Sequence, residues 1–217
     1  MPEPKTPRGP LLFVALPAVR PRRASVPWPR LLVEAALAAE QAGIDALVVE
    51  SGAGLPEPAL DPVVVLAGLA PRTYRLGLVA ELPVTSPEPA RTAWELASLD
   101  AMSGGRAGCL LPEGAAGPPW HGRSPVVLTS SATGHTVTGP RLALDVLTMV
   151  PGETAADRLA VALTRTRTDG LLIRCLAGPG ALARFAVESV PLLRERGLLP
   201  VAQLSPRGLR ERLPAAA

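Results

Sequence analysis

The sequence predicts an α/β fold in which helices cover a parallel sheet. Short apolar runs of strand length alternate along the chain with longer segments that have helical spacing. Proline and glycine stand where segments end, as at Pro17 and Gly43. We count seven strands in this alternation. A closed barrel of parallel strands needs eight, so we expect a barrel-like sheet that is one strand short.

The first half of the chain contains the clearest of these segments. The predicted strands cover residues 11–16, 46–50, 74–80 and 106–111, and the predicted helices cover residues 31–42, 60–70 and 88–102. Pro29 suits the first turn of the first helix, and Asp61 followed by Pro62 suits the start of the second. The second helix is apolar nearly all round, which indicates that one face lies on the sheet and the other needs a partner.

The second half continues the alternation with less regularity. Its predicted strands cover residues 125–129, 144–150 and 170–176, and its predicted helices cover residues 153–166 and 181–196. Pro191 should kink or divide the last helix. We expect residues 1–203 to form a single barrel domain, and residues 204–217, which are rich in Arg, Pro and Ala, to form a loose tail.

Composition excludes several classes of function. The chain is 47% hydrophobic but only 3% aromatic, so its core must consist of Ala, Leu and Val. The net charge of +3 is small, and the arginines between residues 20 and 30 lack interleaved aromatics, which argues against nucleic-acid binding. No signal peptide and no run of about 18 uncharged apolar residues is present, so we expect a soluble cytoplasmic protein without membrane contact. Cys109 and Cys175 lie in apolar runs and should be buried thiols.

A turn of small residues follows the predicted strand at 125–129. Ser130, Ser131, Thr133 and Gly134 offer hydroxyls and accessible backbone amides, which are groups that bind phosphate. Arg123 and Arg141 flank this turn and could help to neutralise a dianion. An ordinary solvent-exposed turn has the same composition, so the residues alone leave both interpretations open.

Three glutamates follow predicted strands. Glu50, Glu81 and Glu113 stand at the carboxyl ends of the second, third and fourth strands, where barrel enzymes carry their sites. Neighbouring carboxylates favour a cation or a metal ion, with His121 or His135 as a further ligand. The alternative is that all three glutamates point into solvent. No regular metal-ligand spacing supports the metal site, so we assign no metal ligands.

The run from Trp94 to Gly108 carries a family resemblance. It is similar to the segment before the fourth strand of luciferase-like, flavin-dependent monooxygenases, especially the branch that oxidises nitrilotriacetate and dibenzothiophene sulfone. Further matching segments are residues 39–46, 60–73 and 76–78 in the first half, and residues 127–134, 152–170 and 190–198 in the second.

This resemblance implies a TIM-barrel-like fold of the bacterial luciferase type and FMN, or a deazaflavin, as cofactor. It places Ser130, Ser131, Thr133 and Gly134 at the flavin phosphate, and Glu50 and Ser51 beside the flavin at the second strand. It also implies dimerisation through the helices at 60–70 and 88–102.

The chain departs from the family pattern at several places. Ser51 follows Glu50 where the family usually has an aspartate, and Cys109-Leu110 stands where the family has Trp-Asn. Residues 112–124 replace a long insertion.

We therefore expect weak or absent FMN binding and assign no catalytic residue. The first hypothesis is a non-catalytic or accessory homologue that pairs with itself or with a full-length flavin monooxygenase. The alternatives are a compact FMN- or deazaflavin-dependent oxidoreductase and a cation- or metal-binding barrel.

Overall fold

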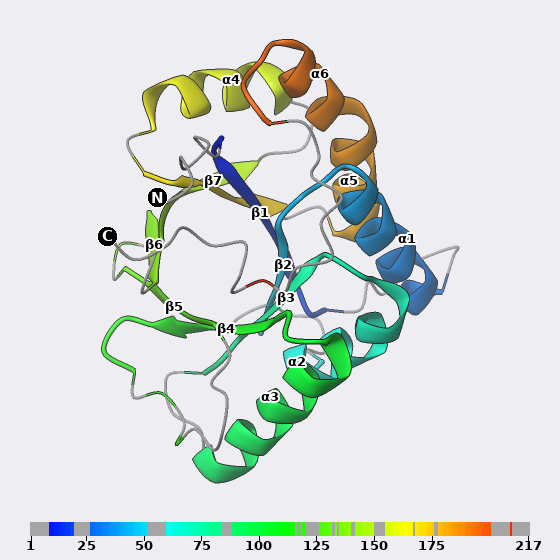
Figure 1. Ribbon diagram of the computed structural model, residues 1–217, viewed down its shortest axis with the longest axis vertical. Helices are drawn as coiled ribbons and strands as arrows, with labels where there is room; N and C mark the ends of the chain where they lie inside the picture. Colours follow the sequence, from blue (N-terminus) through cyan, green and yellow to red (C-terminus); the bar gives the residue numbers. More distant parts are fainter. Residues whose placement is uncertain are drawn as a thin grey trace, which may run out of the picture.

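Strands β1 to β8 close into a barrel in chain order, in a computed structural model (Figure 1). They are β1 (Leu11–Pro17), β2 (Ala46–Glu50), β3 (Gly77–Glu81), β4 (Ala107–Pro112), β5 (Val126–Ser130), β6 (Thr136–Gly139), β7 (Leu142–Met149) and β8 (Gly170–Cys175). The structure describes residues 9–19, 27–51, 60–83, 88–115, 117, 119, 126–131, 133, 135–139, 142–149, 155–166, 168–175, 178–200 and 209. The α/β barrel class predicted from the alternation is confirmed.

Helices cover one part of the barrel circumference and leave the β5–β6 side bare of described helices (Figure 1). They are α1 (Trp28–Gln41), α2 (Pro62–Leu69), α3 (Pro89–Ser103), α4 (Ala155–Arg165), α5 (Pro179–Arg184) and α6 (Val190–Glu195). A π-helical turn, Phe185–Ser189, separates α5 from α6. Pro191 has no amide hydrogen to donate, so the predicted division of this last helix has a direct cause.

The prediction of seven parallel strands was one strand short: the seven predicted strands are present and run parallel, and the barrel closes with an eighth. The strand that it missed, β6, runs antiparallel to both β5 and β7. Within β6 only Val137 is fully buried, whereas the flanking Thr136 and Thr138 are partly or fully exposed. Such a short alternating strand has no continuous apolar run, which is the signal that marks a buried parallel strand.

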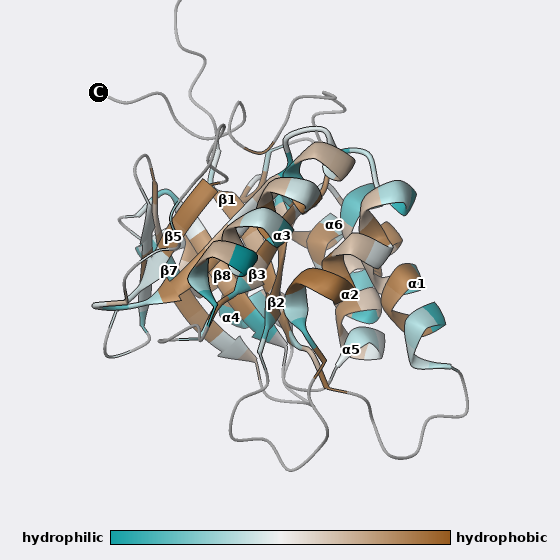
Figure 2. Ribbon diagram, turned by 90° about the horizontal axis from the view of Figure 1, so that it is seen from below, coloured by the Kyte–Doolittle hydropathy of each residue, from teal (hydrophilic) through white to brown (hydrophobic). Residues whose placement is uncertain are grey.

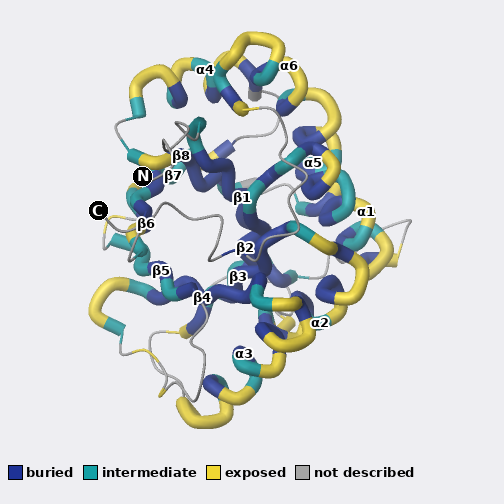
Figure 3. The backbone as a smooth tube through the Cα atoms, viewed as in Figure 1, coloured by how far each residue is buried: buried dark blue, intermediate teal, exposed yellow. Residues whose placement is uncertain are grey.

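The apolar core has two layers, inside and outside the strand ring. Figures 2 and 3 show that the strands of the ring are mostly hydrophobic and buried. The outer layer packs strands against helices and includes Leu47, Leu66 and Leu96. The inner layer fills the barrel itself with alternate residues of the strands, such as Phe13 and Leu172. The strands therefore bury both faces, as their near-continuous apolar sequences require.

Four carboxylates form hydrogen bonds with the backbone at the amino ends of the strands. Each accepts hydrogen bonds from backbone amides of another segment, and so satisfies donors that would otherwise be unpaired. The pairs are Glu40 with the amides of residues 74–76, Asp45 with Leu12, Asp100 with Ala107 and Asp169 with Ala143. These acidic groups have structural partners at the end of the barrel opposite the expected site.

The Ser103-Gly104-Gly105-Arg106 turn links α3 to β4. Gly104 ends the helix with a φ of 68°, and Gly105 follows with a φ of 82°, a region that other residues avoid. Arg106 is almost fully buried, and its guanidinium donates to the carbonyls of Ala70, Thr73 and Leu76. The turn thus places the Arg106 guanidinium against the backbone carbonyls of residues 70–76, which follow α2.

Candidate functional site

Glu50 and Arg174 form an ion pair at the carboxyl end of the barrel. Glu50 follows the interior residues Ala46 and Val48 with a period of two, and Arg174 stands two residues after the interior Leu172. The Nε atom of Arg174 lies 2.6 Å from Oε1 of Glu50. Strand β1 lies between β2 and β8, so the two side chains meet across its end.

Glu81 joins this pair through Ser51. The Ser51 backbone N–H and hydroxyl both donate to Oε2 of Glu81, at 2.8 Å and 2.9 Å. We call Glu50, Ser51, Glu81 and Arg174 the mouth cluster. The structure thus brings together three residues that the sequence singled out, and it adds Arg174, which sequence reasoning missed. The sequence did contain a signal for Arg174: it stands at the end of an apolar strand, two residues after the inward-facing Leu172.

The mouth cluster carries two carboxylates and one guanidinium. Burial raises the pKa of Glu50, and the charge of Glu81 raises it further, while Arg174 acts in the opposite direction. No described residue pairs with the terminal nitrogens of Arg174 or with the second oxygens of the two glutamates. The cluster therefore retains both donors and acceptors for a ligand.

The described residues do not support the metal-binding alternative. Glu113 is exposed, and no three His, Cys, Asp or Glu side chains in the described part gather closely enough to hold a metal ion. His135 is exposed in the β5–β6 turn, and His121 lies outside the described residues.

The Ser130–Thr133 turn connects two antiparallel strands. The Ser131 hydroxyl accepts from the Thr136 N–H at 3.2 Å and lies 3.3 Å from the Thr133 hydroxyl. The next described element is β6 and not a helix, so the turn lacks a helix start that would favour a phosphate.

The rest of the predicted phosphate site lies outside the described residues. This applies to Gly134 and to both flanking arginines, Arg123 and Arg141. The described residues supply hydroxyls but neither a cation nor a helix start, so by themselves they do not form a complete flavin phosphate site. The assignment of Ser130, Ser131, Thr133 and Gly134 as phosphate ligands stays a prediction.

Leu110 and Cys109 lie on opposite faces of β4. Leu110 packs inside the barrel, whereas Cys109 packs in the outer layer between strands and helices. The barrel interior is therefore apolar at Leu110, one of the two residues that stand where the resembling family has Trp-Asn. Cys109 is fully buried, as predicted, and this burial raises the pKa of its thiol to about 12. The side chain of Cys175 lies outside the described residues.

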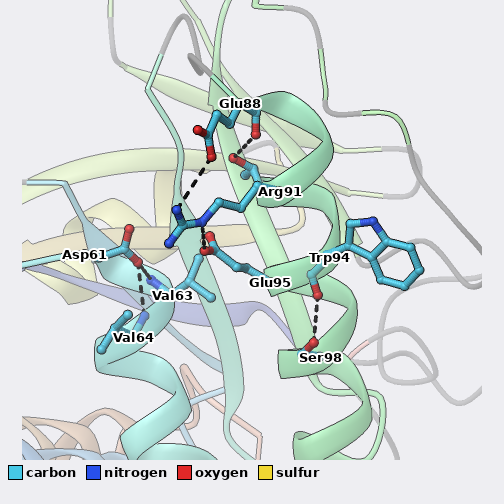
Figure 4. Close-up of polar contacts among 9 residues, drawn as sticks. Asp61, Val63, Val64, Glu88, Arg91, Trp94, Glu95 and Ser98 are labelled. Atoms are coloured by element: carbon cyan, nitrogen blue, oxygen red, sulfur yellow. Dashed lines mark hydrogen bonds and ion pairs between the residues drawn. The ribbon is translucent and has the colours of Figure 1, made fainter.

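Helices α2 and α3 contact each other and expose several apolar side chains (Figure 4). Asp61 caps α2 as predicted, because its Oδ1 accepts from the amides of Val63 and Val64. One face of α2 is buried, but the Val64 side chain is 70% exposed. On α3, Trp94 points away from α2 and is 62% exposed, and Met102 is similarly exposed. We use the name α2–α3 surface for the exposed sides of these two helices, which carry Val64, Trp94 and Met102.

Comparisons with known proteins agree with this architecture. The model of the luciferase-like monooxygenase family matches residues 11–138, which is more than half of the chain. A search of curated proteins found no significant match. Among the described helices, none is both long enough and apolar enough to cross a bilayer.

Two solved structures share the fold over nearly the whole chain. The EDTA monooxygenase of Chelativorans sp. BNC1 is 16% identical, with a TM-score of 0.69 over 94% of this chain and 98% of its own. A riboflavin lyase, solved with modified FMN and its substrate riboflavin, is also 16% identical, with a TM-score of 0.64 over 95% of this chain and 96% of its own. At this identity the likeness concerns the fold, while the family match concerns the sequence. This chain therefore belongs to the luciferase-like monooxygenase family.

Proposed function

We propose that this protein works as a subunit, paired with a second copy or with a full-length flavin monooxygenase, and that it does not act as a monooxygenase by itself. The observation that carries the proposal is the α2–α3 surface. Tryptophan and methionine side chains are enriched in protein interfaces relative to the rest of the surface. Trp94 is the natural anchor, because tryptophan contributes more than most residues to binding.

Several features of the barrel support the non-catalytic part of the proposal. Flavin oxygenation needs a firmly held cofactor and a cover that excludes water. Between β4 and β5 the chain has only residues 113–125 from which such a cover could be built. The interior at Leu110 is apolar, and in the mouth cluster Arg174 is already paired with Glu50.

The pairing is tested by light scattering coupled to size exclusion at micromolar concentration. We expect a dimer for the wild type and a monomer for Trp94→Glu and Val64→Glu. Val187→Glu is the matched control, because Val187 is a valine of similar exposure (66%) that lies outside the α2–α3 surface. A wild type that is monomeric and that co-purifies with no co-expressed full-length flavin monooxygenase would refute the pairing.

A compact FMN- or deazaflavin-dependent oxidoreductase is the second candidate. Arg174 favours it, because its terminal nitrogens have no described partner and can donate to a flavin oxygen at the mouth. Titration with FMN and with reduced FMN, followed by absorbance, tests it. Under the first proposal we expect little or no spectral change at high micromolar ligand. A clear change that Arg174→Met abolishes would favour the oxidoreductase.

A further inference from the structure

The amino end of the barrel interior is built from unusually small residues. Three consecutive strands contribute Ala46 from β2, Gly77 from β3 and Gly108 from β4. Ala46 and Gly77 stand opposite each other in the ladder, and Gly108 stands opposite the residue two positions after Gly77. Barrels of this kind normally fill each interior layer with bulky branched side chains. These three positions therefore leave space that another group must occupy. We call them the amino-end socket.

Leu209 occupies the amino-end socket. It is fully buried and belongs to the interior cluster that contains Ala46. A Cβ atom on Gly77 would lie 2.8 Å from Cδ1 of Leu209, and a Cβ atom on Gly108 would lie 3.5 Å from Cδ2. The leucine side chain thus rests directly on both glycines, in space that any larger residue at Gly77 would take.

We infer that Leu209 is the missing interior side chain of the barrel, supplied by the C-terminal segment of the same chain. The observation bears on residues 204–217, which the sequence predicts to be a loose tail and of which the structure describes Leu209 alone. An interior void costs stability because its lining loses van der Waals contacts. Glycine in a strand also marks a place where another group approaches closely. The glycines and the leucine are therefore complementary parts of one packing unit.

Thermal unfolding of the full chain tests the inference. We expect Leu209→Ala to lower Tm by about 5–15 °C, the range for deletion of a buried leucine side chain in a chain of this size. Leu209→Val should give a smaller loss, which keeps the test valid if the alanine variant does not fold. Leu192→Ala is the matched control, because Leu192 is 43% exposed and should shift Tm by no more than about 2 °C. A Leu209→Ala shift within the control range would overturn the inference.

A double-mutant cycle tests the contact itself. Gly77→Ala introduces a methyl that meets Leu209 and also the Cβ atom of Ala46 and the Asp45 carbonyl oxygen, so the Leu209→Ala background should remove part of its cost in Tm but not all of it. Strictly additive losses would show that the two residues do not share the space. A truncation after residue 203 should lose at least as much Tm as Leu209→Ala, whereas a truncation after residue 210 should lose little. If the wild type is a dimer that Leu209→Ala alone dissociates, Leu209 packs into the barrel of a second copy. That result would overturn the assignment to the same chain.

Discussion

Arg174 and Glu50 are bonded although their strands do not touch. Strand β1 separates β8 from β2, yet Nε of Arg174 lies 2.6 Å from Oε1 of Glu50. The two side chains are 25% and 13% exposed, so they are screened much less than a surface pair. The ion pair thus links the carboxyl ends of β2 and β8 across the end of β1.

Arg174→Ala should lower the free energy of unfolding by about 1–3 kcal/mol, because it leaves a largely buried carboxylate without its cation. Urea denaturation at neutral pH measures the loss. Arg30→Ala is the matched control: Arg30 also binds a glutamate through Nε, at 2.8 Å, but this pair with Glu34 is exposed and should contribute little. Equal effects of the two substitutions would contradict the burial argument.

Glu50→Gln should change the pH dependence of stability. The folded protein raises the pKa of Glu50 through burial, so it holds this proton more tightly than the unfolded chain does. The contribution of Glu50 to stability is therefore greatest below its ordinary pKa of about 4.3 and is lost as the pH rises toward the folded value. Denaturant titrations from acid to neutral pH should show the wild type losing stability relative to Glu50→Gln across this window. A wild type that keeps its stability relative to Glu50→Gln, or gains stability relative to it, as the pH rises would contradict the prediction.

Arg106→Lys should destabilise the fold by about 3 kcal/mol or more. Lysine keeps the charge but cannot replace a planar fork that donates to the carbonyls of Ala70, Thr73 and Leu76 at once. Urea unfolding gives the free energy directly. Arg91→Lys on α3 is the control, since the Arg91 side chain is 71% exposed and should tolerate the exchange. A tolerated Arg106→Lys would mean that the carbonyls find other donors.

The Cys109 thiol should be inert in the folded protein. Burial raises its pKa to about 12, so almost no thiolate exists at pH 8 to attack a disulfide reagent. The measurement is modification by Ellman's reagent in a Cys175→Ser background, where Cys109 is the single remaining thiol. We expect reaction only after denaturant is added. Rapid modification in native buffer would show that the outer layer opens locally at β4.

Local rules predicted the first half of the fold well. The strand at 46–50 has its predicted bounds, and Asp61 caps α2 as its position before a proline indicated. These segments could be predicted because their signals lie close together in the sequence. Buried parallel strands are continuous apolar runs, and a cap lies within three residues of the amides that it binds.

The residues that prediction missed depend on long-range packing. Val137 is the one fully buried residue of a four-residue strand, whose existence depends on pairing with β5 and β7. Arg174 becomes meaningful only when barrel closure brings β8 beside β1 and Glu50 within reach. Leu209 lies in a segment whose composition indicates a loose tail, and only the small residues of three distant strands explain its burial. No local pattern contains this information.

The reversed strand β6 divides the outside of the barrel into two kinds of wall. Between β1 and β2, and between β3 and β4, the return crossing of a parallel pair lays a helix on the ring, namely α1 and α3. Strand β6 instead runs antiparallel to both of its neighbours, and on the wall between β5 and β7 the Thr138 side chain is exposed to water. An assembly that forms through the helices therefore leaves the β5–β7 side of the barrel, with its Thr138 hydroxyl, facing solvent.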